Sequence, residues 1–159
     1  MIDHVRLTSS GEIALRDRLQ SNAELHVAAL QSFGLDLRIG ALPGEYCPGE
    51  FSVNLAGIVK VSGSAQRTTK NGWLLSTVVQ VLGSESLRQV LSACHDALGY
   101  PFDPDTVGTL ADLDPGIEAD AVRSRLIGAY PITGRRAMSD VPPDVHSKAE
   151  ELARLATPC

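Results

Sequence analysis

Cysteine, basic charge and long apolar runs are all scarce in this chain of 159 residues. The three cysteines, Cys47, Cys94 and Cys159, are odd in number and far apart, which indicates reduced thiols rather than a disulfide framework. The 14 Lys and Arg residues are outnumbered by 19 Asp and Glu residues, which gives a formal charge of −5. The sequence therefore predicts no broad basic surface and no nucleic-acid partner.

Signals for export or membrane insertion are also lacking. No window approaches the ~18 apolar residues of a membrane span, and Met1 to Arg6 lack the basic start and apolar run of a signal peptide. We therefore expect a cytoplasmic protein with no membrane partner. With 43% apolar and 21% charged residues, the chain is long enough for one globular domain with its own core.

The pattern along the chain predicts an α+β fold. Alternation of apolar and polar residues predicts strands at 35–39, 51–55 and 58–62, the last two forming a hairpin with its turn near Ala56-Gly57. The apolar run 73–81 predicts a central strand covered on both sides. Strands confined to residues 35–82 with helices around them favour a mostly antiparallel sheet backed by helices.

Four helices are expected after residue 20. Their predicted starts are the capping box Ser21-x-x-Glu24, Ser84 or Ser86, Asp114-Pro115 and the loop after Pro142-Pro143. Ser9-x-x-Glu12 is a further capping-box pattern. The expected organisation is an N-terminal segment with a short helix at 1–20, a main domain at 21–132, and a C-terminal loop and helix at 133–159.

The predicted hairpin carries a lysine. A turn centred on Ala56 pairs Lys60 with Ser52 and puts both on a polar side with Asn54 and Ser62. From the pattern alone, a solvated polar side is favoured. Acyl transfer could use such a fixed cation together with a cysteine nucleophile.

That cysteine, Cys47, lies in a loop bracketed by Pro and Gly. In the same register it lies opposite Ala65, and at ~3.3 Å per residue this leaves it well over 10 Å from Lys60. A break at Pro48-Gly49 would instead let the loop fold back over the small residues Gly63, Ser64 and Ala65. Both arrangements remain open at this point.

These motifs resemble a known family. Gly44-Glu45-Tyr46-Cys47-Pro48-Gly49, a strand, and then Lys60-x-x-Gly63-x-Ala65-Gln66-Arg67 are similar to the second half of the catalytic domain of lipoate-protein ligases. That family also contains octanoyltransferases and lipoyl amidotransferases, and it shares its fold with biotin protein ligases. The resemblance covers roughly residues 25 to 130. It implies transfer of a lipoyl or octanoyl group to a lysine of a carrier domain.

The resemblance also implies residue roles. Lys60 matches the family lysine that contacts the acyl carbonyl and, in ligases, the phosphate of an acyl-adenylate. Cys47 lies in a loop like the one that holds the nucleophile of the amidotransferases. Gly63 and Ala65, with Ser64 between them, match small positions that line the acyl channel. The implied substrates of the ligase route are ATP and lipoate, and the implied partners are a lipoyl carrier domain or an acyl carrier protein.

One family segment has no match before Cys47. The family carries Arg-Arg-x-x-Gly-Gly there, and Gly134-Arg135-Arg136 differs from it in place and order. The chain thus resembles the distal half of the domain. In the family, the earlier half forms the other wall of the acyl and nucleotide site, so a second chain that supplies this wall is a further expected partner. A ligase, a thioester-forming transferase, a non-catalytic binding subunit and an inactive remnant all remain open.

The other candidate sites carry less information. Cys94-His95-Asp96 offers metal ligands, but Cys94 belongs to an apolar helical stripe and no second ligand cluster has fitting spacing, so no metal is predicted. The remaining candidates are expected to be ordinary surface, turn or cap residues: His4, His26, His146, Asp103, Asp105, Asp112 and Asp114.

Overall fold

A five-stranded antiparallel sheet in the order β1-β5-β4-β3-β2 forms the centre of the molecule. The computed structural model describes residues 1–7, 14–131, 143–145, 147–148 and 151. The strands are β1 (Ile2–Leu7), β2 (Leu37–Ile39), β3 (Val53–Leu55), β4 (Val59–Thr69) and β5 (Gly72–Val79). The helices are α1 (Leu15–Leu30), α2 (Ser84–Leu98) and α3 (Ala119–Ala129), with 3-10 turns at Gln31–Phe33, Pro104–Thr106 and Leu110–Asp112. The predicted α+β class is confirmed.

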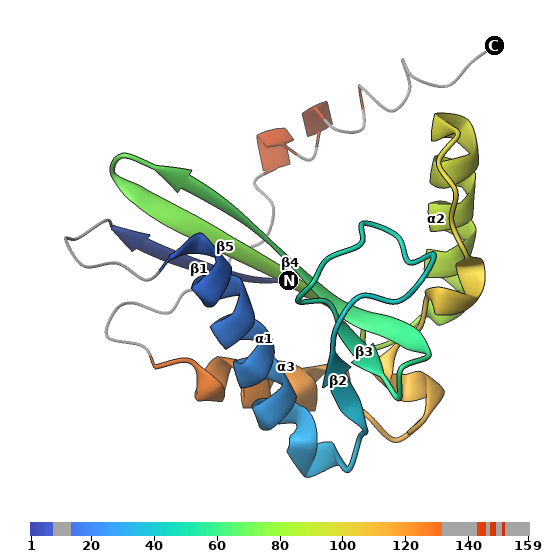
Figure 1. The fold of residues 1–159 in the computed structure, drawn as a ribbon, viewed down its shortest axis with the longest axis horizontal. Helices are drawn as coiled ribbons and strands as arrows, with labels where there is room; N and C mark the ends of the chain where they lie inside the picture. Colours follow the sequence, from blue (N-terminus) through green and yellow to red (C-terminus); the bar gives the residue numbers. More distant parts are fainter. Residues whose placement is uncertain (8–13, 132–142, 146, 149–150, 152–159) are drawn as a thin grey trace.

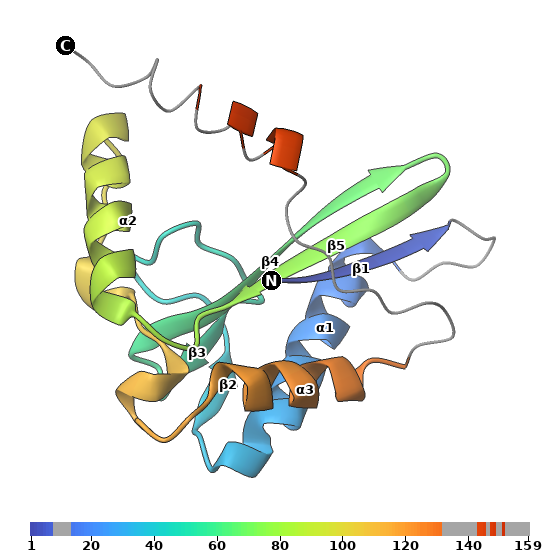
Figure 2. The ribbon, with the colours of Figure 1, turned by 180° about the vertical axis from the view of Figure 1, so that it is seen from behind.

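The two faces of the sheet differ in what covers them. We call the face against which α1 and α3 pack the inner face, and its opposite the outer face. Both views show α1 and α3 near one another and α2 well apart from them (Figures 1 and 2). The core joins α1, α3 and the sheet, and it contains Ala23, Leu30, Val53, Leu55, Val61, Leu110, Ile117, Val122 and Leu126. Within the described residues, no helix is long and apolar enough to cross a bilayer.

A β-bulge in β4 corrects the predicted register of the hairpin. Val53 pairs with Ser62, but its neighbour Asn54 pairs with Lys60, so Val61 is an extra residue on β4. A bulge of this kind reverses which side chains share a face. Lys60 therefore lies beside Gly63, where an added Cβ would be 3.3 Å from the lysine Cε, and not opposite Ser52 as predicted.

β5 is a central strand, as predicted, but it is not covered on both sides. The strand lies between β1 and β4, but only its inner-face residues Trp73, Leu75 and Thr77 are buried. On its outer face, Leu74 and Val78 are 37% and 50% exposed. The described part of the structure therefore covers this strand on its inner face and leaves these outer-face residues partly exposed.

The sequence pattern missed β1 altogether. This strand pairs with β5 in register from Ile2↔Thr77 to Leu7↔Gly72 and forms one edge of the sheet. A polar residue, His4, faces inward with its ring against Trp73 (4.9 Å between centroids), while apolar Val5 is 68% exposed, so the strand lacks the usual apolar-in, polar-out alternation. The N-terminal segment therefore belongs to the sheet, although strands were expected only between residues 35 and 82.

Helix boundaries differ from the capping patterns. α1 begins at Leu15 rather than Ser21 and runs through the predicted limit at residue 20. α3 begins at Ala119, after the turn that contains Asp114-Pro115. α2 begins at Ser84 and ends before Gly99, whose left-handed conformation caps it as predicted. The Ser9-x-x-Glu12 pattern and most of the C-terminal loop and helix lie outside the described residues.

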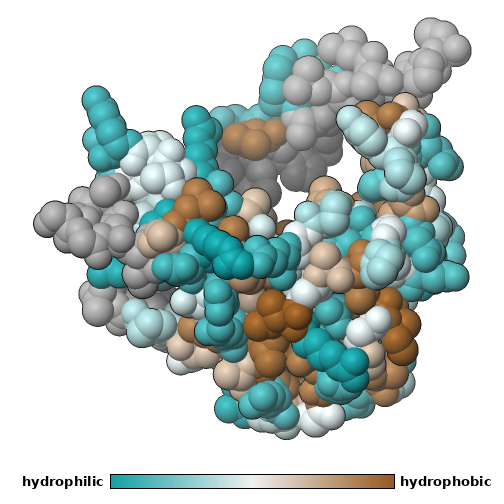
Figure 3. Space-filling model, in the orientation of Figure 1, coloured by the Kyte–Doolittle hydropathy of each residue, from teal (hydrophilic) through white to brown (hydrophobic). Residues whose placement is uncertain are grey.

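The apolar stripe of α2 is not covered by the rest of the described structure. No residue of α2 is fully buried, and Val90 and Leu98 are 60% and 68% exposed. Figure 3 shows apolar surface, in brown, among polar residues over the part of the molecule where α2 lies. α2 is therefore a surface helix beside the sheet rather than a core helix.

Candidate functional site

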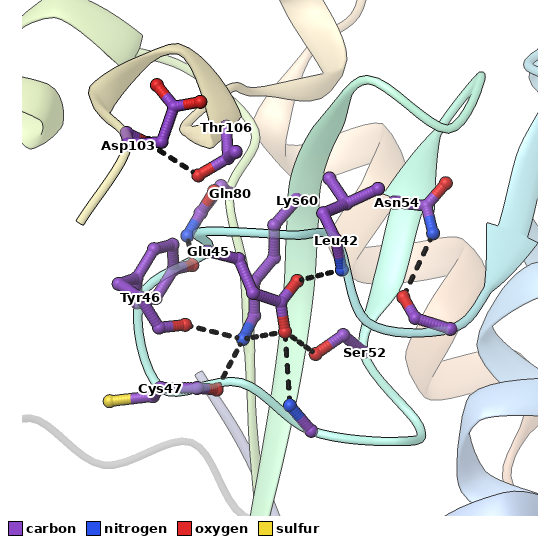
Figure 4. A network of polar contacts seen from close by, with 12 residues as sticks. Leu42, Glu45, Tyr46, Cys47, Ser52, Asn54, Lys60, Gln80, Asp103 and Thr106 are labelled. Atoms are coloured by element: carbon purple, nitrogen blue, oxygen red, sulfur yellow. Dashed lines mark hydrogen bonds and ion pairs between the residues drawn. The ribbon is translucent and has the colours of Figure 1, made fainter. Parts of the chain in front are cut away.

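The loop from residue 40 to residue 52 folds back over the outer face of β4. Its tip reaches Lys60, whose Nζ donates hydrogen bonds to the carbonyl oxygens of Tyr46 (3.0 Å) and Cys47 (2.8 Å). Of the two arrangements left open by the sequence, the structure thus has the folded loop. Figure 4 shows the lysine reaching the loop from β4.

A buried ion pair lies under this loop. Glu45 Oε1 lies 3.3 Å from Lys60 Nζ, and the two side chains are 0% and 3% exposed, respectively. The predicted solvated polar side is wrong, because Ser52, Asn54, Lys60 and Ser62 are all buried. The loop covers Ser52, Asn54 and Lys60, and Ser52 Oγ donates to Glu45 at 2.7 Å. Ser62 lies beyond the bulge, paired with the core residue Val53, and its Oγ donates to the Val78 carbonyl (2.9 Å). Glu45 was not predicted as a site residue, since a charged residue between glycine and proline looks like an exposed turn residue.

Tyr46 closes the other side of the lysine. Lys60 Nζ lies 4.6 Å from the centre of the Tyr46 ring, within the range of a cation–π interaction. The Tyr46 hydroxyl donates to the side-chain oxygen of Gln80, whose amide nitrogen can then donate to the carbonyl oxygens of Lys60 (2.7 Å) and Gly108 (2.5 Å). Burial, followed by the charges of Glu45 and Cys47, raises the pKa of Tyr46. The phenol therefore remains a neutral donor at neutral pH.

The segment after α2 packs against β4 beside Lys60. Val107 forms a parallel β-bridge with Lys60. Gly108 lies so close to Val59 that an added Cβ would be 2.4 Å from its Cγ2, so only glycine fits this position. The aspartates of this segment cap turns as predicted: Asp103 accepts from Asp105 N, Asp112 from Thr109 N and Asp114 from Gly116 N.

A cavity of about 580 Å³ lies over the outer face beside this loop. Gly63, Ser64, Ala65 and Val78 line it from the sheet, while Leu87 and Leu91 line it from α2. Cys47 lines it from the loop; the cysteine is exposed, and its thiol points away from the Lys60 ammonium (Figure 4). The structure therefore brings all five predicted site residues to one cavity. Their chemical roles stay predictions.

A second polar network lies on the inner face, and sequence reasoning missed it. His26 was expected at the surface but is 1% exposed, with Nε2 2.7 Å from the Tyr130 hydroxyl. Tyr130 donates to Asn22 Oδ1 (2.6 Å), and Asn22 Nδ2 donates to Ser64 Oγ (3.1 Å) and Thr77 Oγ1 (3.0 Å). The spacing of positions 22, 26 and 30 on one face of α1, ending in buried Leu30, could have revealed it.

This inner network is neutral at pH 7. Burial lowers the pKa of His26 to about 4 and raises the pKa of Tyr130 to about 12. The desolvation of each group disfavours its charged form. The inner network therefore differs in kind from the Glu45–Lys60 pair on the outer face.

The other predicted ligand types do not converge on a metal. Among the described residues, no group of three or more His, Cys, Asp or Glu side chains could hold a metal ion. Cys94 is exposed on α2, and the His95 ring stacks on Phe102 with 4.5 Å between centroids. His95 therefore packs against an aromatic ring rather than a ligand set.

Two bacterial proteins are similar to this chain in sequence. Both are octanoyl-GcvH:protein N-octanoyltransferases. The one from Geobacillus kaustophilus is 30% identical over 104 residues, which are 62% of this chain and 36% of that protein. The one from Oceanobacillus iheyensis is 27% identical over 103 residues, 58% of this chain and 37% of that protein. The chain thus spans little more than a third of the length of these relatives. No protein-family model matches it.

Solved structures share the fold. A lipoate-protein ligase A bound with ATP superposes with a TM-score of 0.63 at 22% identity, over 94% of this chain and 58% of that one. A putative lipoate protein ligase from Thermoplasma acidophilum with bound lipoic acid gives a TM-score of 0.62 at 22% identity, over 96% and 59%. A bi-partite lipoate protein ligase of the same organism gives 0.55 at 21% identity, over 94% and 57%. The chain therefore has the fold of lipoate-protein ligases, and its sequence is similar to about a third of the length of the octanoyltransferases.

Proposed function

We propose that this chain acts in protein lipoylation as an acyltransferase: Cys47 accepts an octanoyl or lipoyl group, which then passes to a lysine of a lipoyl carrier domain. The single observation that carries the proposal is the folded loop. Lys60 holds the Cys47 carbonyl at 2.8 Å, and Cys47, which is exposed, lines a cavity with Gly63 and Ala65. A fixed loop supplies the positioning that nucleophilic catalysis needs.

The proposed reaction has two balanced steps. The Cys47 thiol gives up its proton as its sulfur attacks the acyl carbonyl carbon, the bond to the donor breaks, and the donor group leaves with that proton. The amine of the carrier lysine then attacks the thioester carbonyl, the carbon–sulfur bond breaks as the amide forms, and the proton lost by the amine passes to the sulfur and restores the Cys47 thiol. A nucleophilic thiol has to stay reduced, which fits the cytoplasmic location expected from the sequence.

The cavity suits an acyl chain better than a polyphosphate. Its sheet side carries small residues, and Val78, Leu87 and Leu91 add apolar surface. Lys60 is the only basic residue among the described residues that line it. The three hydrogen-bond partners of its ammonium are Glu45 and two main-chain carbonyls. The small and apolar residues that line the cavity therefore fit a lipoyl or octanoyl chain.

The second candidate is an ATP-dependent ligase that forms an acyl-adenylate. The similar structures with ATP or lipoic acid favour it. For Lys60 to contact a phosphate, however, the loop would have to release its 3% exposed side chain. The transferase route requires no such movement, so we place it first.

A partner that supplies the rest of the site is part of the proposal. This sequence has no Arg-Arg-x-x-Gly-Gly segment before Cys47. A related ligase is bi-partite, which supports a second chain as the source of the other wall. We therefore expect binding of an acyl carrier protein or a lipoyl carrier domain, with full activity when the other wall is present. A non-catalytic binding subunit or an inactive remnant is the competing outcome.

The test is transfer of octanoate from octanoyl-acyl carrier protein, or from an octanoylated GcvH, to an apo lipoyl domain, followed by intact mass. Cys47→Ser is expected to abolish transfer, and Cys94→Ser, which changes the other exposed cysteine, is expected to leave it intact. A parallel arm supplies ATP and lipoate. Modification only in that arm, and unchanged by Cys47→Ser, would support the ligase. Carrier binding without modification in either arm would support the binding subunit.

A further inference from the structure

Glu45 joins three separated points of the loop that carries Cys47. Its Oε2 accepts from the backbone N–H of Leu42 (3.1 Å), and its Oε1 accepts from the N–H of Gly49 (3.1 Å) and from Ser52 Oγ (2.7 Å). These partners lie near the beginning, the middle and the end of the loop. One fully buried carboxylate thus sets the shape of the whole segment.

Lys60 extends this control to the loop tip. Its ammonium bonds the Glu45 carboxylate and the carbonyls of Tyr46 and Cys47, which belong to the two peptide bonds that flank Cys47 (Figure 4). A buried ammonium needs a nearby carboxylate, because an uncompensated buried charge is strongly unfavourable. Glu45 therefore holds the Lys60 side chain inside the loop, where its ammonium can bond these two carbonyls.

The backbone of Cys47 shows that it is held in place. Its φ is 42°, in the left-handed region that residues other than glycine seldom adopt. Such a conformation persists where the surroundings fix it. Here the fixing contacts are the two hydrogen bonds from Lys60, and the position of Lys60 depends on Glu45.

We propose that Glu45 is a positioning residue for Cys47. It does not touch the acyl group. It fixes, together with Lys60, the loop conformation that presents the Cys47 thiol at the cavity over Gly63 and Ala65. The consequence for acyl transfer rests on the proposed function, whereas the presentation of the thiol does not.

Two measurements on the full chain test this without an acyl donor. The first is the rate of alkylation of Cys47 by iodoacetamide relative to Cys94, measured by peptide mapping. The second is amide hydrogen exchange of the Leu42 and Gly49 N–H groups. In Glu45→Gln, loss of a charge-assisted hydrogen bond is expected to speed their exchange about tenfold, and to raise the Cys47-to-Cys94 ratio severalfold. Glu85→Gln is the matched control, because Glu85 forms an exposed pair with Arg88 on α2.

The double variant Glu45→Gln, Lys60→Met separates positioning from stability, and it replaces Glu45→Gln if that single variant does not fold. Removing both charges is expected to restore most of the free energy of unfolding, while the carbonyls of Tyr46 and Cys47 still lack their donor. The ratio of Cys47 to Cys94 alkylation rates should therefore still differ from the wild-type value. A wild-type ratio and wild-type exchange in either folded variant would overturn the proposal. If wild-type protein takes up no octanoate, the proposed function fails, and these two measurements still decide the role of Glu45.

Discussion

Two buried polar networks lie on opposite faces of the same sheet, and they differ in charge and in access. The outer network is built on the Glu45–Lys60 ion pair and ends at the exposed Cys47. The inner network is neutral and joins His26 and Tyr130 to Asn22, all of them buried. Burial alone therefore does not mark the functional face. On the face that we propose to be functional, a buried charge pair lies beside an exposed cysteine.

Strand β4 takes part in both networks. Its residue Ser64 accepts a hydrogen bond from Asn22 of the inner network, while its neighbours Gly63 and Ala65 line the outer cavity. The inner network joins α1 and the end of α3 to the sheet, whereas the outer network joins a loop to the sheet. We therefore expect damage to the outer network to change both stability and the presentation of Cys47, and damage to the inner network to change stability alone.

The largest expected effect is that of Lys60→Met. It leaves the Glu45 carboxylate buried without a counter-charge, which should lower the free energy of unfolding by about 3–5 kcal/mol. Denaturation in urea measures this loss. Lys70→Met, at the exposed turn between β4 and β5, is the control and should change stability by less than about 0.5 kcal/mol. An equal loss in both variants would remove the distinction between the buried pair and an ordinary surface lysine.

The pH dependence of stability tests whether His26 of the inner network is buried in its neutral form. The pKa of His26 is about 4 in the folded chain against 6.5 for a free histidine. As the pH falls, the unfolded state therefore binds the proton before the folded state does. The contribution of neutral His26 to the free energy of unfolding is complete above pH 6.5 and falls by about 3 kcal/mol as the pH drops to 4. Urea midpoints of the wild type and of His26→Gln should converge across this window. Parallel pH curves for the two proteins would contradict a buried neutral His26.

Tyr130→Phe should have a smaller effect. It removes the donor to Asn22 and the partner of His26 without changing any charge. The unsatisfied groups should cost about 1–3 kcal/mol, measured by urea denaturation, while the Cys47-to-Cys94 alkylation ratio should keep its wild-type value. Tyr100→Phe is the control, because Tyr100 is 65% exposed. A changed cysteine ratio in Tyr130→Phe would show that the two networks are coupled through β4.

The sequence predicted the helix-backed sheet and the five candidate site residues, because strand alternation and the Gly/Pro-bracketed cysteine are local signals. It could not predict the β4 bulge, since one extra residue in a strand, Val61, leaves no mark in composition. The bulge decides which neighbours Lys60 has. This is why the predicted pairing with Ser52 and the solvated polar side were both wrong.

Glu45 and His26 were missed for a related reason. Each is a polar residue of a type usually exposed, and each is buried because tertiary contacts satisfy it. The four contacts of Glu45 come from residues up to 15 positions away, and the partner of His26 is 104 positions away. No local pattern records such distant partners. For His26 alone there was a local signal, because positions 22, 26 and 30 share one face of α1.

The most direct test of the central claim is the position of an octanoyl adduct after brief incubation with octanoyl-acyl carrier protein. Proteolysis and mass spectrometry would locate the adduct, and hydroxylamine would identify it as a thioester. We expect a hydroxylamine-labile octanoyl group on Cys47, with Cys94 unmodified and no adduct in Cys47→Ser. An adduct that persists in Cys47→Ser, or that divides equally between Cys47 and Cys94, would contradict the claim that the folded loop presents Cys47 as the acyl acceptor.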